Sequence, residues 1–161
     1  MSELNIDSEG SGRIPIIKLF GQLLVPLQGD VTDHQASRLR EDILLAIQKY
    51  GALGVVIDVS GLWIVDSHLC SVLAQLALAS RLMGTRTVLS GVSPDIAVTL
   101  QTMGVGLEGM ETALGLEEAL ELLGLQVTQR SIDSRRQELE AIVDDLVSVA
   151  STNPAHPGTR T

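Results

Sequence analysis

The sequence has 161 residues, 45% of them hydrophobic, which is enough for one domain with its own apolar core. The 20 acidic and 11 basic residues give a formal charge of −9, which argues against nucleic acid or an anionic membrane surface as the partner. Three aromatic residues and a single cysteine, Cys70, argue against base-stacking platforms, an internal disulfide framework and a cysteine-rich zinc site.

The two ends of the chain differ in composition from its middle. Residues 1–12 are acidic and rich in Ser and Gly, and we expect a flexible lead-in without the basic start of a secretory signal. Residues 126–161 form a C-terminal extension, with a helix at about 134–150 and a disordered end. The body, residues 13–125, has no membrane-spanning stretch, and we expect a cytoplasmic protein.

Four apolar runs in the body predict strands. Ile14–Phe20 and Leu23–Leu27 are separated by Gly21 and Gln22, which favours an early hairpin. Val55–Val59 is rich in β-branched residues and is typical of a buried central strand. Thr87–Leu89 is a shorter run of the same kind.

Helical patterns alternate with these strands. They cover Asp33–Tyr50, Ser67–Met83, Pro94–Thr102 and Gly115–Leu123. The first of them places five apolar residues on one face: Ala36, Leu39, Ile43, Ala46 and Ile47. This alternation predicts an α/β domain with about four strands and four helices.

The extension contains a further amphipathic pattern. Ser134 and Gln137, three residues apart, have the spacing of a capping box. Arg135 and Arg136 precede Asp144 and Asp145. That order of charges is unfavourable for the helix dipole, so we expect the apolar stripe to need a partner surface. The stripe consists of Leu139, Ile142, Val143, Leu146 and Ala150.

Two motifs suggest enzymes but lack the context that those enzymes need. Gly104–Gly109 matches G-x-G-x-x-G, but a helix is predicted before it and Glu108 would oppose a phosphate. The consecutive residues Asp66, Ser67 and His68 cannot converge as a nucleophilic triad, because their side chains leave the backbone in different directions.

The junction before the second helix has two interpretations. Asp66 or Ser67 can be a simple N-cap. Alternatively, Ser67 is phosphorylated, because a phosphate at a helix N-terminus meets free amides, although Asp58 and Asp66 would repel it. The residues alone leave both interpretations open.

Three blocks of the body resemble the STAS domains, and most of all the RsbS-type scaffold and antagonist proteins of the bacterial stressosome. The blocks are IPIIKLFGQLLVPLQ, GVVIDVSGLWIVDSHL and LMGTRTVLSGVSPDIAVTLQTMGVGLEGMETALGLEEALELL. The resemblance covers residues 13–125 and implies a single STAS domain, a small mixed β-sheet with about four helices packed on it.

The resemblance also implies a non-enzymatic switch. In the family, the Ser after the Asp at the start of the second helix is phosphorylated by an RsbT-type switch kinase, which the unphosphorylated scaffold holds. That position is Ser67, and Thr99 matches a second site of RsbR-type relatives. The expected surroundings of the switch are Asp58, Gly61, Trp63, Asp66 and His68.

The sequence departs from the family at His68, where relatives often have a bulky apolar residue, and in the extension. Trp63 has two interpretations, an interface anchor or a buried plug of its loop, whereas Cys70 is expected in the core.

The resemblance further implies a set of partners. We expect an RsbT-type kinase, an RsbR-type paralogue, self-association into a large assembly and an RsbX-type phosphatase. No nucleic acid, membrane, metal or cofactor is expected. An alternative of the same fold is an anti-sigma factor antagonist that binds an anti-sigma kinase directly in a small complex.

Overall fold

The computed structural model describes residues 12–104, 106–125 and 129–151, with the side chains of the last segment described from residue 136. Almost all of the expected lead-in and the expected disordered end lie outside these residues. The chain divides into two compact units, Met1–Gln126 and Val127–Thr161.

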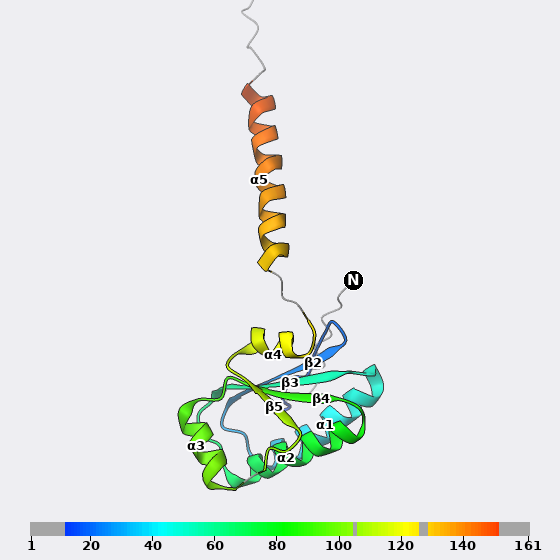
Figure 1. Ribbon diagram of the computed structural model, residues 1–161, viewed down its shortest axis with the longest axis vertical. Coiled ribbons are helices and arrows are strands. Elements are labelled where there is room, and N and C mark those ends of the chain that lie inside the picture. Colours follow the sequence, from blue (N-terminus) through cyan, green and yellow to red (C-terminus); the bar gives the residue numbers. More distant parts are fainter. Residues whose placement is uncertain (1–11, 105, 126–128, 152–161) are drawn as a thin grey trace, which may run out of the picture. The chain divides into compact units, whose positions relative to one another are not determined.

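The first unit is built on a mixed five-stranded sheet of order β1-β2-β3-β4-β5 (Figure 1). Strand β1 pairs antiparallel with β2, and the other neighbours are parallel. The strands are β1 (Ile17–Leu19), β2 (Gln22–Gly29), β3 (Gly54–Leu62), β4 (Arg86–Ser90) and β5 (Met110–Ala113). The helices are α1 (Asp33–Tyr50), α2 (Ser67–Leu82), α3 (Pro94–Thr102) and α4 (Leu116–Leu122).

The predicted hairpin is confirmed, but its turn lies one residue earlier than predicted, because Gln22 belongs to β2. Leu19 pairs with Gln22 across a two-residue turn in which both Phe20 and Gly21 have positive φ, 49° and 78°. Such turns match the twist of the flanking strands. A glycine takes this backbone conformation freely, whereas Phe20 adopts it against its steric preference.

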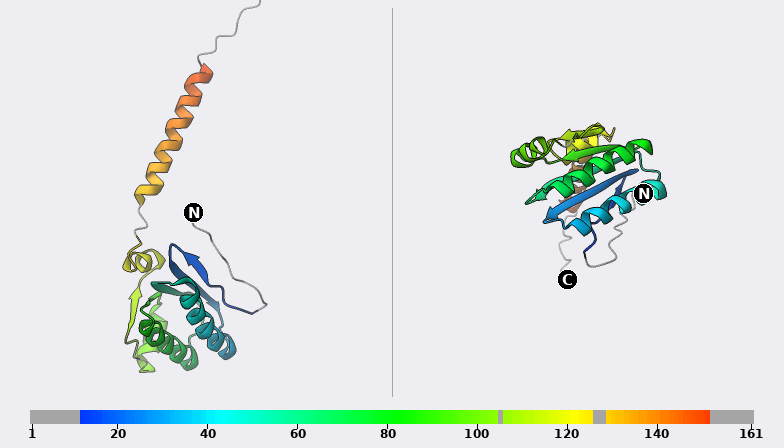
Figure 2. Two further views of the ribbon diagram at one scale, coloured as in Figure 1. Left: turned by 90° about the vertical axis from the view of Figure 1, so that its right-hand side faces the viewer. Right: turned by 90° about the horizontal axis from the view of Figure 1, so that it is seen from below.

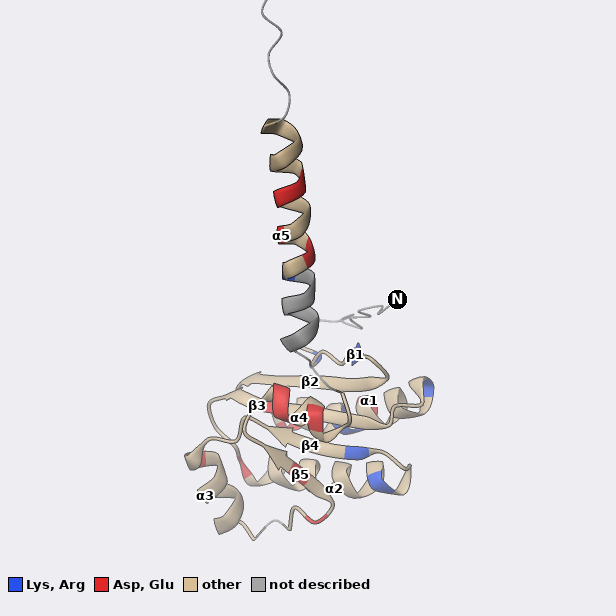
Figure 3. Cartoon of the chain, turned by 45° about the horizontal axis from the view of Figure 1, so that its top comes forward, with Lys and Arg blue, Asp and Glu red and all other residues tan. Residues whose placement is uncertain are grey.

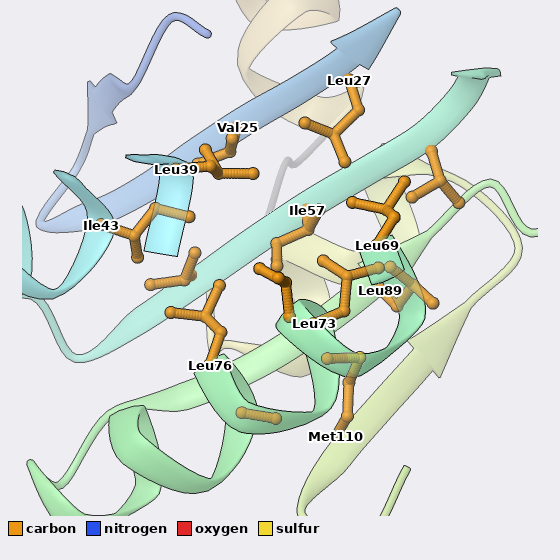
Figure 4. Close-up of a cluster of buried hydrophobic side chains, with 14 of the residues drawn as sticks. Val25, Leu27, Leu39, Ile43, Ile57, Leu69, Leu73, Leu76, Leu89 and Met110 are labelled. Atoms are coloured by element: carbon orange, nitrogen blue, oxygen red, sulfur yellow. The ribbon is translucent and has the colours of Figure 1, made fainter. Parts of the chain in front are cut away.

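The two faces of the sheet bury different helices (Figure 2). Alternate residues of β3 point to opposite faces, so Val55 and Ile57 join the cluster beneath α1 and α2, while Val56 packs with Val88 and Leu120 of α4 on the other side. The larger cluster is shown in Figure 4. Truncating one of its leucines to alanine would cost about 2–5 kcal/mol.

Helix α1 follows its sequence pattern closely. The five residues predicted to share a face are its buried residues. Thr32 and Gln35 form a reciprocal capping box at its start, and Gly51 ends it in the left-handed conformation that favours glycine. Helix α1 therefore begins and ends where its capping residues dictate.

Strand β5 is absent from the sequence prediction, which has four strands. Met110–Ala113 has only four residues and no alternating burial, and it becomes a strand by parallel pairing with β4. Residues 104–109 consequently lie between helix α3 and strand β5, the reverse of the order that a dinucleotide fingerprint needs.

The second unit contains α5 (Gln129–Ser151). The helix begins at Gln129, so Ser134 lies inside it and the predicted capping box at Ser134 is wrong. Among the described residues, no helix is long and apolar enough to cross a membrane.

Candidate functional site

The candidate site lies where β3 leaves the sheet and the chain enters α2. The pairing of β2 with β3 is irregular just before this point, between Pro26 and Gln28. Gly61 allows the close approach, because a Cβ atom there would lie 3.0 Å from the carbonyl oxygen of Leu27. Trp63 N–H then donates to the carbonyl of Gly29 at 3.2 Å, which fixes the start of the loop.

The loop exposes two large apolar side chains and buries a third. Trp63 is 80% exposed and Ile64 is 67% exposed, whereas Val65 is only 8% exposed. The interpretation of Trp63 as a buried plug is therefore wrong, because Val65 has that position. Ile64 was not among the predicted site residues, and only its place beside Trp63 in an apolar tripeptide could have indicated it.

Asp66 ends the loop as the N-cap of α2. Its backbone is extended, and its carboxylate accepts the N–H of Leu69 at 2.7 Å. The first intrahelical bond joins Cys70 N–H to the carbonyl of Asp66 at 3.1 Å. Asp66, and not Ser67, is therefore the capping residue.

Ser67 is the first residue of α2, and its side chain is exposed. The first N–H groups of a helix lack intrahelical acceptors, and the positive end of the helix dipole lies there. An anion on Ser67 would meet these amides, while the Asp66 carboxylate next to it would repel the anion. The arrangement thus suits a hydroxyl that gains or loses a charged group.

The side chain of His68 contacts helix α1. It is half-buried, and its Nε2 lies 3.3 Å from the hydroxyl of Ser37 on α1. The imidazole therefore links α2 to α1, and these two helices lie side by side on one face of the sheet (Figure 2). This contact fits the rejection of a triad of Asp66, Ser67 and His68.

Asp58 faces the neighbouring strand. It is half-buried, and its Oδ1 accepts Ser60 N–H at 3.1 Å and, at 3.4 Å, the hydroxyl of Ser90, its pairing partner on β4. The loop after β4 crosses here at Gly91, where φ is +73° and a Cβ would lie 2.9 Å from Asp58 Oδ1. Gly91 is a position that sequence reasoning missed, although a glycine directly after a strand is its signal.

Thr99 lies in the second turn of α3. It is half-buried, and its hydroxyl donates to the carbonyl of Asp95 at 2.8 Å. The helix is capped by Ser93, whose Oγ accepts Ile96 N–H at 3.3 Å, with Pro94 at its first position as the sequence predicts. The Thr99 hydroxyl is therefore already engaged within its own helix.

Cys70 is fully buried, as predicted, and burial together with the nearby Asp66 carboxylate raises the pKa of its thiol. A raised pKa keeps the thiol protonated and unreactive. Among the described residues, no group of three or more His, Cys, Asp or Glu side chains comes together in a way that could hold a metal ion.

Comparison with known proteins agrees with this architecture. The STAS domain model matches residues 5–119. The chain is 31% identical over 121 residues to the RsbT co-antagonist protein RsbRA of Bacillus subtilis (strain 168), covering 74% of this chain and 44% of RsbRA. The chain thus spans less than half the length of the RsbR relatives that it matches.

Two solved structures are also similar. An RsbS of Moorella thermoacetica with a serine-to-glutamate substitution has 34% identity and a TM-score of 0.63, covering 69% of this chain and 94% of that one. A chain from a structure of the stressosome, described as a signal integration and transduction hub, has 36% identity and a TM-score of 0.61, covering 68% and 96%. The chain therefore belongs to the STAS-domain family.

Proposed function

We propose that this chain is a non-enzymatic signalling scaffold of a bacterial stressosome, similar to RsbS, that holds a serine/threonine switch kinase and releases it when Ser67 is phosphorylated. The observation that carries the proposal is the exposed Ser67 at the first position of α2, directly after the capping carboxylate of Asp66. The similarity to RsbS and to the stressosome chain supports it.

The surface around Ser67 suits a protein partner. Trp63 and Ile64 are exposed in the loop that leads to it. Tryptophan is enriched among the residues that dominate binding energy at interfaces. A kinase that covers these side chains would also cover the Ser67 hydroxyl, which is neutral and costs little to bury when it is hydrogen-bonded.

Phosphorylation makes the burial of the Ser67 side chain beneath the kinase unfavourable. It adds about −1.5 to −2 charges beside Asp66. Free helix amides favour the phosphate in water, but beneath a bound partner the dianion loses its hydration and keeps the repulsion of the carboxylate. Phosphorylation therefore weakens the complex with the kinase, whereas the free phosphorylated chain remains stable.

The same proposal includes the wider set of partners. These are an RsbT-type kinase, an RsbR-type paralogue with which the chain co-assembles, and an RsbX-type phosphatase that resets Ser67, all in the cytoplasm. The RsbRA and stressosome likenesses support the paralogue and the assembly.

Mass spectrometry tests the proposal. The chain is incubated with its cognate kinase and ATP, and phosphorylated residues are mapped in the wild type and in Ser67→Ala and Thr99→Ala variants. We expect phosphate on Ser67 in the wild type and in Thr99→Ala, and its loss in Ser67→Ala. Absence of phosphate on Ser67 in the wild type would refute the switch.

The size of the complex separates this scaffold from an anti-sigma factor antagonist. Co-expression with the kinase and an RsbR-type paralogue should give a particle in the megadalton range by light scattering. A small heteromer with an anti-sigma kinase would instead support the antagonist.

A further inference from the structure

The end of the body where α1 and α2 end and β3 and β4 begin exposes large apolar side chains. Four of them, between 45% and 91% exposed, form what we call the Leu53 patch: Phe20, Leu53, Leu82 and Met83. Leu53 N–H donates to the carbonyl of Gly21 at 3.4 Å, which joins its loop to the hairpin of Phe20. The Thr85 hydroxyl donates to the carbonyl of Ala52 at 2.8 Å, which joins the end of α2 to the same loop. Exposed apolar side chains gathered in this way mark an interaction surface.

Basic residues surround the Leu53 patch. Four of the seven bases of the body lie at this end: Lys18, Lys49, Arg81 and Arg86. Figure 3 shows basic segments at the ends of α1 and α2 and at the start of β4. The segments that build the surface, 17–22, 47–54 and 79–87, contain no acid. Glu111 of β5 pairs with Arg86 at 2.8 Å, and the surface as a whole remains basic.

Helix α5 has the complementary pattern. Six of its large apolar side chains, between 55% and 66% exposed, form a stripe: Leu139, Ile142, Val143, Leu146, Val147 and Val149. Residues 138–151, which contain the stripe, include four acids and no base. At about 3.6 residues per turn, Glu138 and Asp145 lie along one border of the stripe, and Glu140 and Asp144 lie along the other.

The acidic half of α5 is unfavourable in an isolated helix, because acids near its C-terminal end meet the negative end of the helix dipole. A second α5 would not relieve this, since pairing along the stripe brings acidic borders together. A surface that is apolar at its centre and basic around it would both cover the stripe and attract its acids. The Leu53 patch with its surrounding bases is such a surface.

We propose that α5 of one copy packs on the Leu53 patch of a second copy, with its acidic borders beside the bases of that patch. Leu125 packs against the smaller apolar cluster of the body, and only residues 126–128 connect it to Gln129 at the start of α5. Such a short connection favours exchange of the helix between copies over folding back. In a twofold pair each copy contributes one helix and one patch, so the assembly closes. This inference does not depend on the kinase switch.

Cross-linking locates the contact. One full-length variant carries Met83→Cys in the patch and another carries Val143→Cys in the stripe, while the buried Cys70 does not react. The two variants are mixed with a short bis-maleimide, which joins two thiols, and the linked peptides are identified by mass spectrometry. We expect the link from 83 to 143 to exceed the 83–83 and 143–143 links about fivefold or more, because only the first pair joins complementary surfaces.

Charge reversal tests the complementarity. Lys49→Glu/Arg81→Glu in the variant that provides the patch should lower the yield of the 83–143 link about threefold or more. Glu138→Lys/Asp145→Lys in the variant that provides the helix should lower it equally. Combining the two reversed partners places opposite charges together again and should recover the yield.

Two controls change charge away from the contact. Arg38→Glu reverses an exposed base near the start of α1, and Gln137→Lys/Ala141→Lys adds charge on the face of α5 opposite the stripe. Both should leave the yield unchanged. If α5 packs on the patch of its own chain, the mixture gives no 83–143 link, whereas a chain with both cysteines links within itself. That result, a mixture without excess of the 83–143 link, or a yield that neither reversal changes would each overturn the proposal.

Discussion

Ser67 and Thr99 are both hydroxyl residues near the start of a helix, but their positions give a phosphate opposite environments. Ser67 is the first residue of α2 and is exposed, where helix amides have no intrahelical acceptors. Thr99 is half-buried one turn further into α3, and its hydroxyl already donates to the carbonyl of Asp95. A phosphate on Ser67 gains amide donors, whereas one on Thr99 breaks an existing hydrogen bond and finds no free amides.

The sharpest way to break this comparison is to place the same charge at each position. Ser67→Asp should weaken kinase binding about 30-fold or more, because the new carboxylate loses its hydration beneath the kinase and is repelled by the carboxylate of Asp66. Thr99→Asp should weaken it less than about threefold, as should Thr102→Asp, a control on the same helix that loses a matching hydroxyl bond to Val98.

Calorimetry measures these affinities, with Ser67→Ala as the uncharged reference that retains binding. Equal affinities for Ser67→Ala and Ser67→Asp would contradict the mechanism.

The loop before Ser67 offers a second contrast. Trp63→Ala should weaken kinase binding about tenfold while the melting temperature stays the same, because the indole is 80% exposed in the free chain. Val65→Ala should do the opposite and lower the free energy of unfolding by about 1–2 kcal/mol, since Val65 is buried. A fall in stability with Trp63→Ala and unchanged binding would show that the tryptophan only supports the fold.

The N-cap residues of α2 and α3 provide a third, smaller test. Asp66→Ala and Ser93→Ala each remove a side chain that accepts an N–H at the start of a helix. Each should lower the free energy of unfolding in urea by about 1 kcal/mol. Asp66→Asn keeps the acceptor without the charge and should retain most of the stability, so a large loss in that variant would assign Asp66 a role other than capping.

The smallest effect concerns pH. Because burial and Asp66 raise the pKa of Cys70 in the folded chain, the unfolded chain loses the thiol proton first as pH rises. Stability from this group is therefore complete below about pH 8.5, the ordinary cysteine pKa, and decreases above it. Urea unfolding at about pH 7.5 and 9.5 should show a decrease that Cys70→Ala lacks. An identical decrease in both would show that other groups cause it.

The sequence was sufficient for the elements with strong local signals. The buried face of α1, the Gly51 end of that helix and the Ser93–Pro94 start of α3 follow from residue spacing and capping chemistry. Strand β5 was missed because its four residues become a strand only by pairing with β4. The start of α5 was misplaced because a capping spacing at Ser134 occurs inside a longer helix.

The candidate site could be predicted in part. Asp66 and Ser67 at the start of α2 follow from local chemistry, and the structure decides which of them is the cap. The outward direction of Trp63 and Ile64 depends on Val65 filling the core, and a loop has no periodicity that would reveal this. His68 and Ser37 are 31 residues apart in sequence. Their contact depends on the packing of α1 against α2, which local sequence patterns do not reveal.

The central claim is that phosphorylation of Ser67 releases a kinase held by this surface. A preformed complex of the chain with its kinase is supplied with ATP, and the free kinase and the phosphate on Ser67 are measured over time. We expect the kinase to dissociate in step with phosphorylation of the wild type and to stay bound to Ser67→Ala. A kinase that remains bound after Ser67 is fully phosphorylated, or that leaves Ser67→Ala equally fast, would contradict the account.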